Sequence, residues 1–278
     1  MAHAQDGSAH KTVDKAMRVL HAFSHERPEF SIGDLSRELS MHKSIVSRLV
    51  AALRKWRLLE QDPHSRRVRM GAGAFKLGSL FANRQNIVRT VTPYLGALAM
   101  RTGQSAHAVV LDGTRLLVIA TAESPSALRV IMRVGEYRFV HATAAGKLFL
   151  ALSEPAVLAA VLNDPSLPRL TPGTIVEPGE LQKAMQRVRR ERVSWNLGES
   201  TVGAGAVAAP VVDDAGHIVA AISVVFPLNV VNAAQRQKIA SDTVAAAHEV
   251  SAAFRASGPA AKAAKPRRPR TPARSNPD

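Results

Sequence analysis

The stretch from residue 31 to residue 70 constrains the fold more than any other part of the chain. Ser31, followed three residues later by Asp34, is the signature of a capped helix start, and apolar residues recur after it at helical spacing. A short polar turn at 40–42 separates this helix from a second one over 42–56. Two short helices joined by such a turn are typical of a helix-turn-helix.

The second helix of this pair has an apolar face and a polar face. The apolar residues, which we expect to point one way, are Ile45 or Val46, Leu49, Leu53 and Trp56. Small polar and basic side chains flank them, and such groups can approach base edges or hold phosphates and guanines in a DNA groove. On the helices alone, an ordinary three-helix cluster with a solvated basic face is an equally good interpretation. The candidate DNA contacts on this helix are Lys43, Ser44, Ser47, Arg48 and Arg54.

The segment after these helices favours DNA binding. Residues 58–70 read as strand, turn and strand, and the second strand brings Arg66, Arg67 and Arg69 as further candidate DNA contacts. A basic hairpin in this place is a wing, which lies along the DNA backbone or enters the minor groove, where arginine is attracted. A first helix over 11–24 completes the unit. Its expected apolar face is Val13, Met17, Leu20 and Phe23 or Ala16.

The hydrophobic pattern changes after about residue 105, which predicts a second domain. Asp112-Gly113 is a strong hairpin turn, and residues 213–216 form another between two apolar runs. Hairpins interspersed with helices predict an α/β module with a mainly antiparallel sheet. The expected strands are 106–111, 116–122, 128–134, 193–197, 204–212 and 217–226, and the expected helices are 92–100, 144–152, 154–162, 179–192 and 232–254.

The fold class is therefore α+β, in two domains, as a length of 278 residues also suggests. We expect a disordered N-terminus over 1–10, a winged helix-turn-helix over 11–72, a linker helix over 73–90, an effector-binding domain over 91–256 and a disordered basic tail over 257–278.

Composition narrows the partners. The formal net charge of +15 favours a polyanion, either nucleic acid or an anionic membrane surface. The membrane is the weaker option because no apolar run approaches the roughly 20 residues that span a bilayer. The first ten residues hold no apolar core of a signal peptide, so a cytoplasmic location is the default. The chain has no cysteine, which excludes disulfides, a thiol nucleophile and thiolate zinc sites.

The last twenty residues carry much of the charge. They hold six Lys or Arg against one Asp, together with five prolines and no large apolar residue. Such a segment cannot bury enough surface to offset its ordering entropy, so we expect it to be disordered. A phosphate-binding arm and a solubilising extension are equally good interpretations of it.

The sequence resembles the IclR family of transcriptional regulators over essentially residues 11–255. The likeness is carried by KAMRVL, SIGDLSREL, MHKSIVSRLVAAL, HATAAGKLFLA, NLGES and AVAAPVVDDAGHIVAAISV. The resemblance implies a winged helix-turn-helix joined by a helix to a GAF-like effector-binding domain. It also implies a homodimer or tetramer on a palindromic operator in double-stranded DNA. Two departures are Ile45, where the family commonly has Thr, and a wing that ends in Met70-Gly71 without the usual aromatic residue.

A candidate anion site lies at the start of the helix over 144–152. Thr143 is a good N-cap, and the small side chains of Ala144 and Ala145 leave the first-turn amides uncovered. Helix N-termini attract anions, so a carboxylate could dock there. Close packing of a helix start on the sheet also requires alanine and glycine and is the alternative.

The resemblance marks Asn196, Ala206 and Ser223 as further pocket residues. Ala206 and Val225 are apolar where some relatives have polar groups, which suggests a less polar ligand or fewer hydrogen bonds to it. Because the anion site at the helix start lies beside these apolar neighbours, we expect a small organic acid as effector, aromatic acids included. Arg129 and Arg133 could pair with the acid, although surface positions on a half-exposed strand suit them better. Glu199 could gate the site or cap a helix, and the sequence does not decide between these.

An enzyme and a protein that coats DNA are two alternative functions. An enzyme would need a reactive motif, and the chain has no Gly-x-Ser-x-Gly, no phosphate loop and no HExxH. His107 and His141 are expected to be structural, so we expect no catalytic residue, cofactor or metal. A non-specific architectural protein that coats DNA is the second rival; the basic tail supports it, but coating DNA needs no large α/β domain.

Overall fold

The computed structural model of the chain describes residues 9–84, 86–162 and 167–257. Its contacts divide the chain into two compact units, Met1–Arg84 and Gln85–Asp278. The boundary between them falls in the segment expected to be a connector. No helix in the described ranges is long and apolar enough to cross a bilayer.

The first unit is a three-helix cluster with a small sheet. Its elements are α1 (Ala9–His21), β1 (Glu29–Phe30), α2 (Ile32–Glu38), α3 (Lys43–Lys55), β2 (Leu59–Gln61), β3 (Val68–Met70) and α4 (Ala72–Arg84). The antiparallel sheet has the order β1-β3-β2, so the predicted wing is confirmed. The capping box at Ser31 is also confirmed, because the Ser31 side chain accepts from the Asp34 amide and the Asp34 carboxylate accepts from the Ser31 amide.

A single hydrophobic core holds this unit together. Leu35, Val46 and Leu49 from α2 and α3 pack with Phe30 and Val68 from the sheet. Two parts of the predicted apolar faces were wrong. On α1, the buried stripe is formed by Val19 together with the partly buried Ala16 and Leu20 and, just after the helix, Phe23, whereas Val13 and Met17 lie to one side of it and are exposed. At the end of α3, Trp56 is exposed, because the helix stops there and the chain turns at Arg57, whose φ is +58°.

The second unit is built on one antiparallel sheet. Its elements are α5 (Asn86–Thr102), β4 (Ser105–Asp112), β5 (Arg115–Ala122), β6 (Tyr137–Phe139), α6 (Ala144–Leu152), α7 (Pro155–Leu162), α8 (Pro178–Glu191), β7 (Ser194–Leu197), β8 (Ala204–Val212), β9 (Ile218–Pro227) and α9 (Ala233–Ala256). The strand order β6-β5-β4-β9-β8-β7 joins two hairpin-connected halves through the β4–β9 pair. The predicted hairpin turns at Asp112-Gly113 and at 213–216 are both confirmed.

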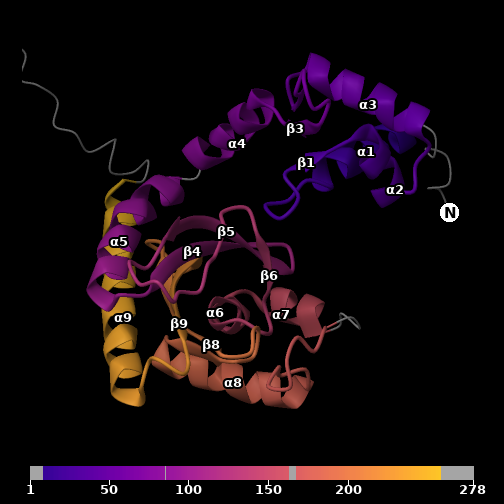
Figure 1. The fold of residues 1–278 in the computed structure, drawn as a ribbon. Helices are drawn as coiled ribbons and strands as arrows, with labels where there is room; N and C mark the ends of the chain where they lie inside the picture. The colour runs from indigo at the N-terminus through magenta and orange to yellow at the C-terminus, as the bar shows by residue number, and fades with distance from the viewer. Residues whose placement is uncertain (1–8, 85, 163–166, 258–278) are drawn as a thin grey trace, which may run out of the picture. The chain divides into compact units, whose positions relative to one another are not determined.

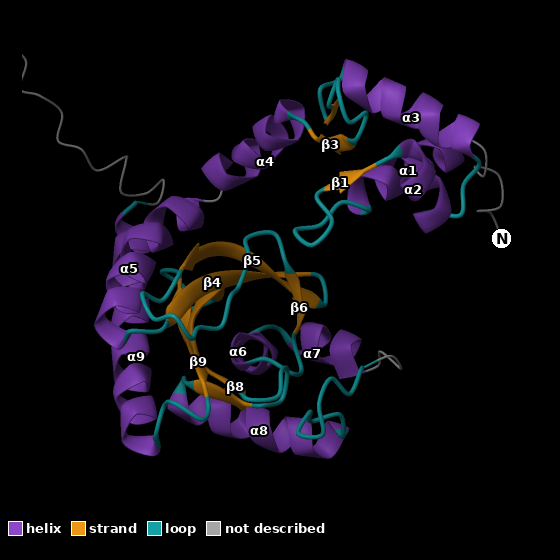
Figure 2. Cartoon of the chain, in the orientation of Figure 1, coloured by secondary structure: helices purple, strands orange, loops and turns teal. Residues whose placement is uncertain are grey.

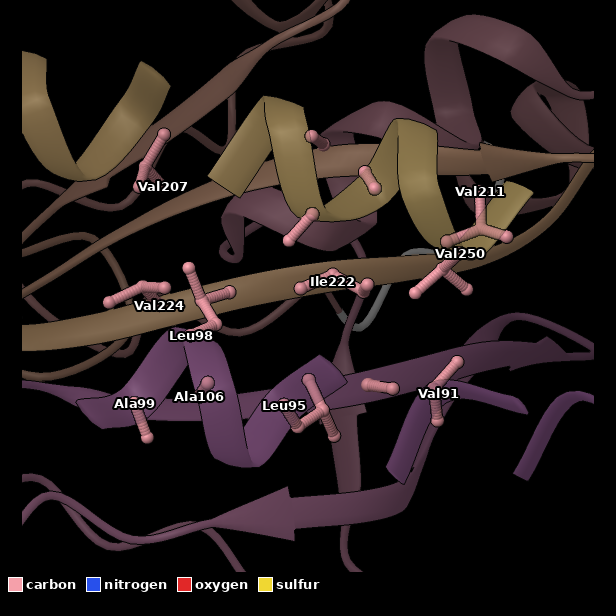
Figure 3. Close-up of a cluster of buried hydrophobic side chains, with 14 of the residues drawn as sticks. Val91, Leu95, Leu98, Ala99, Ala106, Val207, Val211, Ile222, Val224 and Val250 are labelled. Atoms are coloured by element: carbon pink, nitrogen blue, oxygen red, sulfur yellow. The ribbon is translucent and has the colours of Figure 1, made fainter. Parts of the chain in front are cut away.

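Each face of this sheet is covered by its own helices. Helices α5 and α9 lie side by side on one face, and α6 sits inside the curl of the sheet on the other, with α8 beneath it (Figures 1 and 2). Leu95 and Leu98 of α5 pack with Val250 of α9 against Ile222 and Val224 of the sheet (Figure 3). The opposite core, around α6, forms the floor of a pocket.

One predicted strand was wrong. Residues 128–134 form no strand; the edge strand is β6, a few residues later. The chain reaches the sheet only after a turn at Gly135, whose φ is +90° and whose amide donates to the Val118 carbonyl (2.8 Å). Apolar residues of the 128–134 segment therefore pack as a loop: Val130 and Met132 cover the core around α6.

Candidate nucleic-acid interface and effector pocket

Helix α3 presents the polar surface that the sequence predicted. Its residues Val46, Leu49, Val50 and Leu53 are buried in the core. The opposite face is exposed over its whole length, and it carries Lys43, Ser44, Ser47, Arg48 and Arg54. The exposed face of α3 therefore carries the small polar and basic groups that reading a major groove requires.

The start of α3 is held by an unusual cap. The His42 ring accepts from the Ser44 amide (3.4 Å), and its Nδ1 lies 2.9 Å from the Ser44 hydroxyl. Arg48 folds back along the helix and donates to the Ser44 carbonyl (3.3 Å). Ser44 is thus engaged by two neighbours, whereas Lys43 and Ser47 make no such contact within the described residues.

The wing arginines differ in their partners. Arg69 donates to the Glu60 carboxylate (2.6 Å), which raises the pKa of Arg69, and Arg67 donates to the Glu29 carbonyl (3.2 Å). Arg66 lies at the turn with a φ of +57°, and no described residue pairs with its guanidinium. Of the three, Arg66 is therefore the most available for a phosphate. Arg67, which also lies 3.6 Å from the Glu29 carboxylate, and Arg69 would have to share or exchange their carboxylate partners with a phosphate.

The wing turn is pre-organised by Asp62. Its carboxylate accepts from the amides of His64 (2.9 Å) and Ser65 (2.7 Å), and these bonds, that of Ser65 above all, lower its pKa. Behind the turn, Arg54 of α3 donates to the Gln61 side chain (3.1 Å). Arg54 therefore ties the end of α3 to the wing in addition to presenting a charge.

A pocket in the second unit lies between the start of α6 and the inner face of the sheet. The empty space, counted with its open mouth, measures about 500 Å³. All five residues predicted for an effector site line it: Ala144, Ala145, Asn196, Ala206 and Ser223. The apolar part of the wall consists of Val109, Leu116, Val130, Met132 and Val225.

The start of α6 combines close packing with free amides. The Thr143 hydroxyl accepts from the Gly146 amide (3.1 Å), which leaves the amides of Ala144 and Ala145 unused within the helix. A Cβ on Gly146 would overlap the backbone of Val140. Gly146 is therefore required for close packing, and Ala144 and Ala145 line the pocket; an anion bound at their amides stays a prediction.

Two titratable lining residues were not predicted from the sequence. His107 on β4 and Arg138 on β6 both reach the pocket, the first buried and the second half-buried. Burial, and to a lesser degree the charge of Arg138, lower the pKa of His107 to about 4. A signal was present in the sequence, because His107 lies two residues before Val109 on an apolar strand, and residues two apart share a face of the strand.

The loop after β7 closes one side of the pocket and is held by polar bonds. Asn196 accepts from the Glu199 amide (2.7 Å) and donates to the Ser200 hydroxyl (2.8 Å). Thr171 and Thr174 donate to the carbonyls of Gly198 and Glu199, each at 2.7 Å. The Asn196 side chain is therefore largely occupied in shaping the loop.

Glu199 acts neither as a helix cap nor as a lining residue of the pocket. Its carboxylate accepts from Lys147 of α6 (2.5 Å), and both side chains are largely buried. Burial lowers the pKa of Lys147, although the Glu199 charge offsets part of that effect. The pair therefore fastens the pocket loop to α6.

The arginines considered for an acid lie elsewhere. Arg129 pairs with Glu123 (3.1 Å) and Arg133 with Glu136 (3.7 Å), and neither lines the pocket. The surface interpretation of both is the better one. Among the described residues, no group of His, Asp or Glu side chains is arranged to hold a metal ion.

A winged helix-turn-helix on the same chain as an α/β unit with a small-molecule pocket defines the class of ligand-responsive DNA-binding regulators. Comparison with known proteins agrees. The sequence profile of the IclR helix-turn-helix domain matches residues 12–63, and that of the bacterial transcriptional regulator IclR C-terminal domain matches residues 80–252. The chain therefore belongs to the IclR family of bacterial transcriptional regulators.

Individual relatives match over most of their length. The HTH-type transcriptional regulator BhcR of Paracoccus denitrificans is 28% identical over 248 residues, which are 89% of this chain and 88% of BhcR. A solved IclR-type structure from Silicibacter sp. TM1040 is 29% identical, with a TM-score of 0.74 over 87% of this chain and 96% of that one. An IclR homologue from Microbacterium hydrocarbonoxydans shares the fold at 24% identity, with a TM-score of 0.80 over 88% of this chain and 100% of that one.

Proposed function

We propose that this chain binds a palindromic operator in double-stranded DNA as a homodimer or tetramer, and that a small organic acid controls this binding. The observation that carries the effector half is the electrostatic character of the pocket. The two residues at the start of α6 and Arg138 line the pocket together with an apolar wall, and no Asp or Glu is among the described lining residues. Such a pocket favours a carboxylate attached to an apolar body.

A first probe comes from a structural relative. The solved IclR homologue from Microbacterium hydrocarbonoxydans is a complex with 4-hydroxybenzoate. That ligand belongs to that protein, but it is a small aromatic acid of the class that we propose. Calorimetric titrations should therefore begin with 4-hydroxybenzoate and its neutral amide, since a pocket without any preference for the carboxylate would contradict the proposal.

Replacement of Ala144 by Pro is expected to weaken acid binding at least tenfold while α6 remains folded. Proline suits the first position of a helix, and the extended Thr143 backbone (φ −120°, ψ 151°) is compatible with a following proline. The change removes one of the two amides and places ring atoms in the pocket. Calorimetry with the acid and thermal unfolding together measure both effects.

The matched control is Ala233→Pro, at the first position of α9 behind the Asn232 cap. Ala233 is exposed and does not line the pocket. We expect this variant to bind the acid as the parent chain does. Equal affinity in Ala144→Pro and Ala233→Pro would remove the amides of α6 from the site.

For the DNA half, we propose that the exposed face of α3 reads the major groove and that the wing contacts the backbone. The residues assigned are Lys43, Ser44, Ser47, Arg48 and Arg54 on α3, and Arg66, Arg67 and Arg69 on the wing. Arg66 is the first wing residue to test, because its charge is not engaged by a described carboxylate.

Arg48→Ala is expected to weaken operator binding by roughly 1–3 kcal/mol if Arg48 reads a guanine, with a smaller loss on unrelated DNA. Fluorescence anisotropy on operator and scrambled duplexes measures this difference. Arg190→Ala on α8 removes the same exposed charge from the other unit and serves as control. An equal loss on all sequences would make Arg48 a phosphate contact rather than a base-reading residue.

The architectural alternative rests on the net charge of +15. It predicts a steep salt dependence of binding with little sequence preference. Affinities for operator and random DNA across a salt series separate the two functions.

A further inference from the structure

His107 is a buried titratable group without a partner. It is 5% exposed, it lines the pocket, and no described residue lies within hydrogen-bond distance of its Nδ1. Its cross-strand neighbour Ser223 is 1% exposed, lines the same pocket, and has a hydroxyl equally without a partner. Two adjacent buried polar groups left unsatisfied are unfavourable unless a ligand completes them.

The charges around His107 come from few elements. Arg138 on β6 repels a positive charge on the imidazole, and it has no ion-pair partner among the described residues. The facing groups on β5, β9 and the start of α6 are Thr121, Ser223 and the backbone of Ala144 and Ala145, which are all uncharged. Beyond them, Lys147 and Glu199 neutralise each other. Among the residues that the structure describes, the pocket thus holds one positive charge and no negative charge near His107.

We infer that His107 is a specificity-determining contact that becomes protonated when an anionic group of the effector docks against His107 and Ser223. The chain would then bind its acid together with one proton. The proton comes from solvent and adds to the imidazole, and no other covalent bond forms or breaks. The inference rests on the proposed function, since it requires an acidic effector, but it adds the residue that selects the acid and a pH dependence.

The physical reason is the low polarity of the site. In the ligand-free protein, burial and Arg138 keep the imidazole neutral at pH 7, with a pKa of about 4. The attraction of an anion beside the ring opposes both effects, because an ion pair is strong where water is excluded. The pKa of His107 therefore rises in the complex. By linkage, acid binding strengthens as the pH falls through the pKa of the complex, by at most tenfold per pH unit.

The test is calorimetric titration of the full chain with 4-hydroxybenzoate and other monocarboxylates at about pH 8, 7 and 6. Two buffers with different ionisation enthalpies report the number of protons taken up. For the parent chain we expect an affinity that rises about three- to tenfold per pH unit, with uptake of up to one proton. His107→Gln keeps a hydrogen-bonding side chain of similar size that cannot titrate, so its affinity is expected to be independent of pH.

His248→Gln on α9 is the matched control, because His248 is exposed and does not line the pocket. It is expected to keep the pH dependence of the parent chain. Should His107→Gln fail to fold, imidazole NMR of the parent chain decides, because His107 must become protonated near pH 6 only in the acid-saturated form.

The outcomes separate the two hypotheses. Acid binding without proton uptake, an unchanged pH slope in His107→Gln, or a His107 ring that stays neutral in the complex would overturn the inference and leave the acid effector standing. A parent chain that binds none of the acids at any of these pH values would overturn the acid effector and the inference with it.

Discussion

Replacing Lys147 by Met is expected to lower the free energy of unfolding of the second unit by about 3–5 kcal/mol. The substitution keeps most of the apolar stem of Lys147 but leaves the Glu199 carboxylate buried without its cation. That carboxylate has no second donor, since no described group bonds its Oε2. Urea denaturation followed by near-ultraviolet circular dichroism measures the loss, because Trp195 lies in β7, next to the Glu199 loop.

A double-mutant cycle gives the control. Glu199→Gln alone leaves a buried ammonium group and is also destabilising, whereas the double variant Lys147→Met/Glu199→Gln removes both charges. We expect the double variant to be more stable than the Lys147→Met variant. Additive losses would mean that the two side chains act independently, and would contradict the role of the pair in fastening the pocket loop to α6.

Gly146→Ala is the second change with a large expected effect, a loss of about 3 kcal/mol in the free energy of unfolding. The added methyl group would meet the backbone of Val140, which cannot yield as a flexible side chain can. Overpacking of this kind forces shifts of the backbone and of neighbouring side chains. Thermal unfolding measures the effect, and the acid affinity of the surviving folded fraction reports whether the start of α6 has moved.

The matched control is Gly96→Ala in α5. An added Cβ at Gly96 meets nothing within 4 Å, so the substitution should stabilise the helix by about 0.5–1 kcal/mol. The two variants make the same chemical change with opposite expected signs. A Gly146→Ala variant as stable as Gly96→Ala would show that the start of α6 is not closely packed on Val140.

Local signals account for most of what the sequence predicted correctly. The Ser31 capping box, the ends of α3 and the hairpin turn at Asp112-Gly113 each depend on residues within a few positions of one another. The nearly continuous apolar runs of β8 and β9 are likewise readable without the fold. These are the features in which backbone preference and side-chain chemistry agree.

Long-range pairing accounts for most of the features that could not be predicted from the sequence. The two-residue strand β1 exists only because Phe30 pairs with Val68, and no local pattern marks it. The strand expected at 128–134 has the right composition, but the turn at Gly135 delivers a later segment to the edge of the sheet. Only the folded chain shows that this loop covers the pocket.

In the candidate site, too, the local features were predicted and those that depend on long-range pairing were missed. The five effector residues predicted from the helix start and from the IclR resemblance do line one pocket. Its charged and titratable part was missed, because Arg138 and His107 meet there only after β5 has placed β6 and β4 on either side. The bond between Lys147 and Glu199 joins residues 52 positions apart, and the sequence offered no pattern for it.

A gel-shift assay tests the central claim most directly. The purified chain is mixed with DNA from upstream of its own gene, excess competitor DNA and, in parallel lanes, 4-hydroxybenzoate or other small acids. We predict a sequence-specific shift that at least one acid strengthens or abolishes, and that Ala144→Pro makes insensitive to that acid. A shift on every fragment that weakens with salt and ignores all acids would contradict this account and favour a protein that coats DNA.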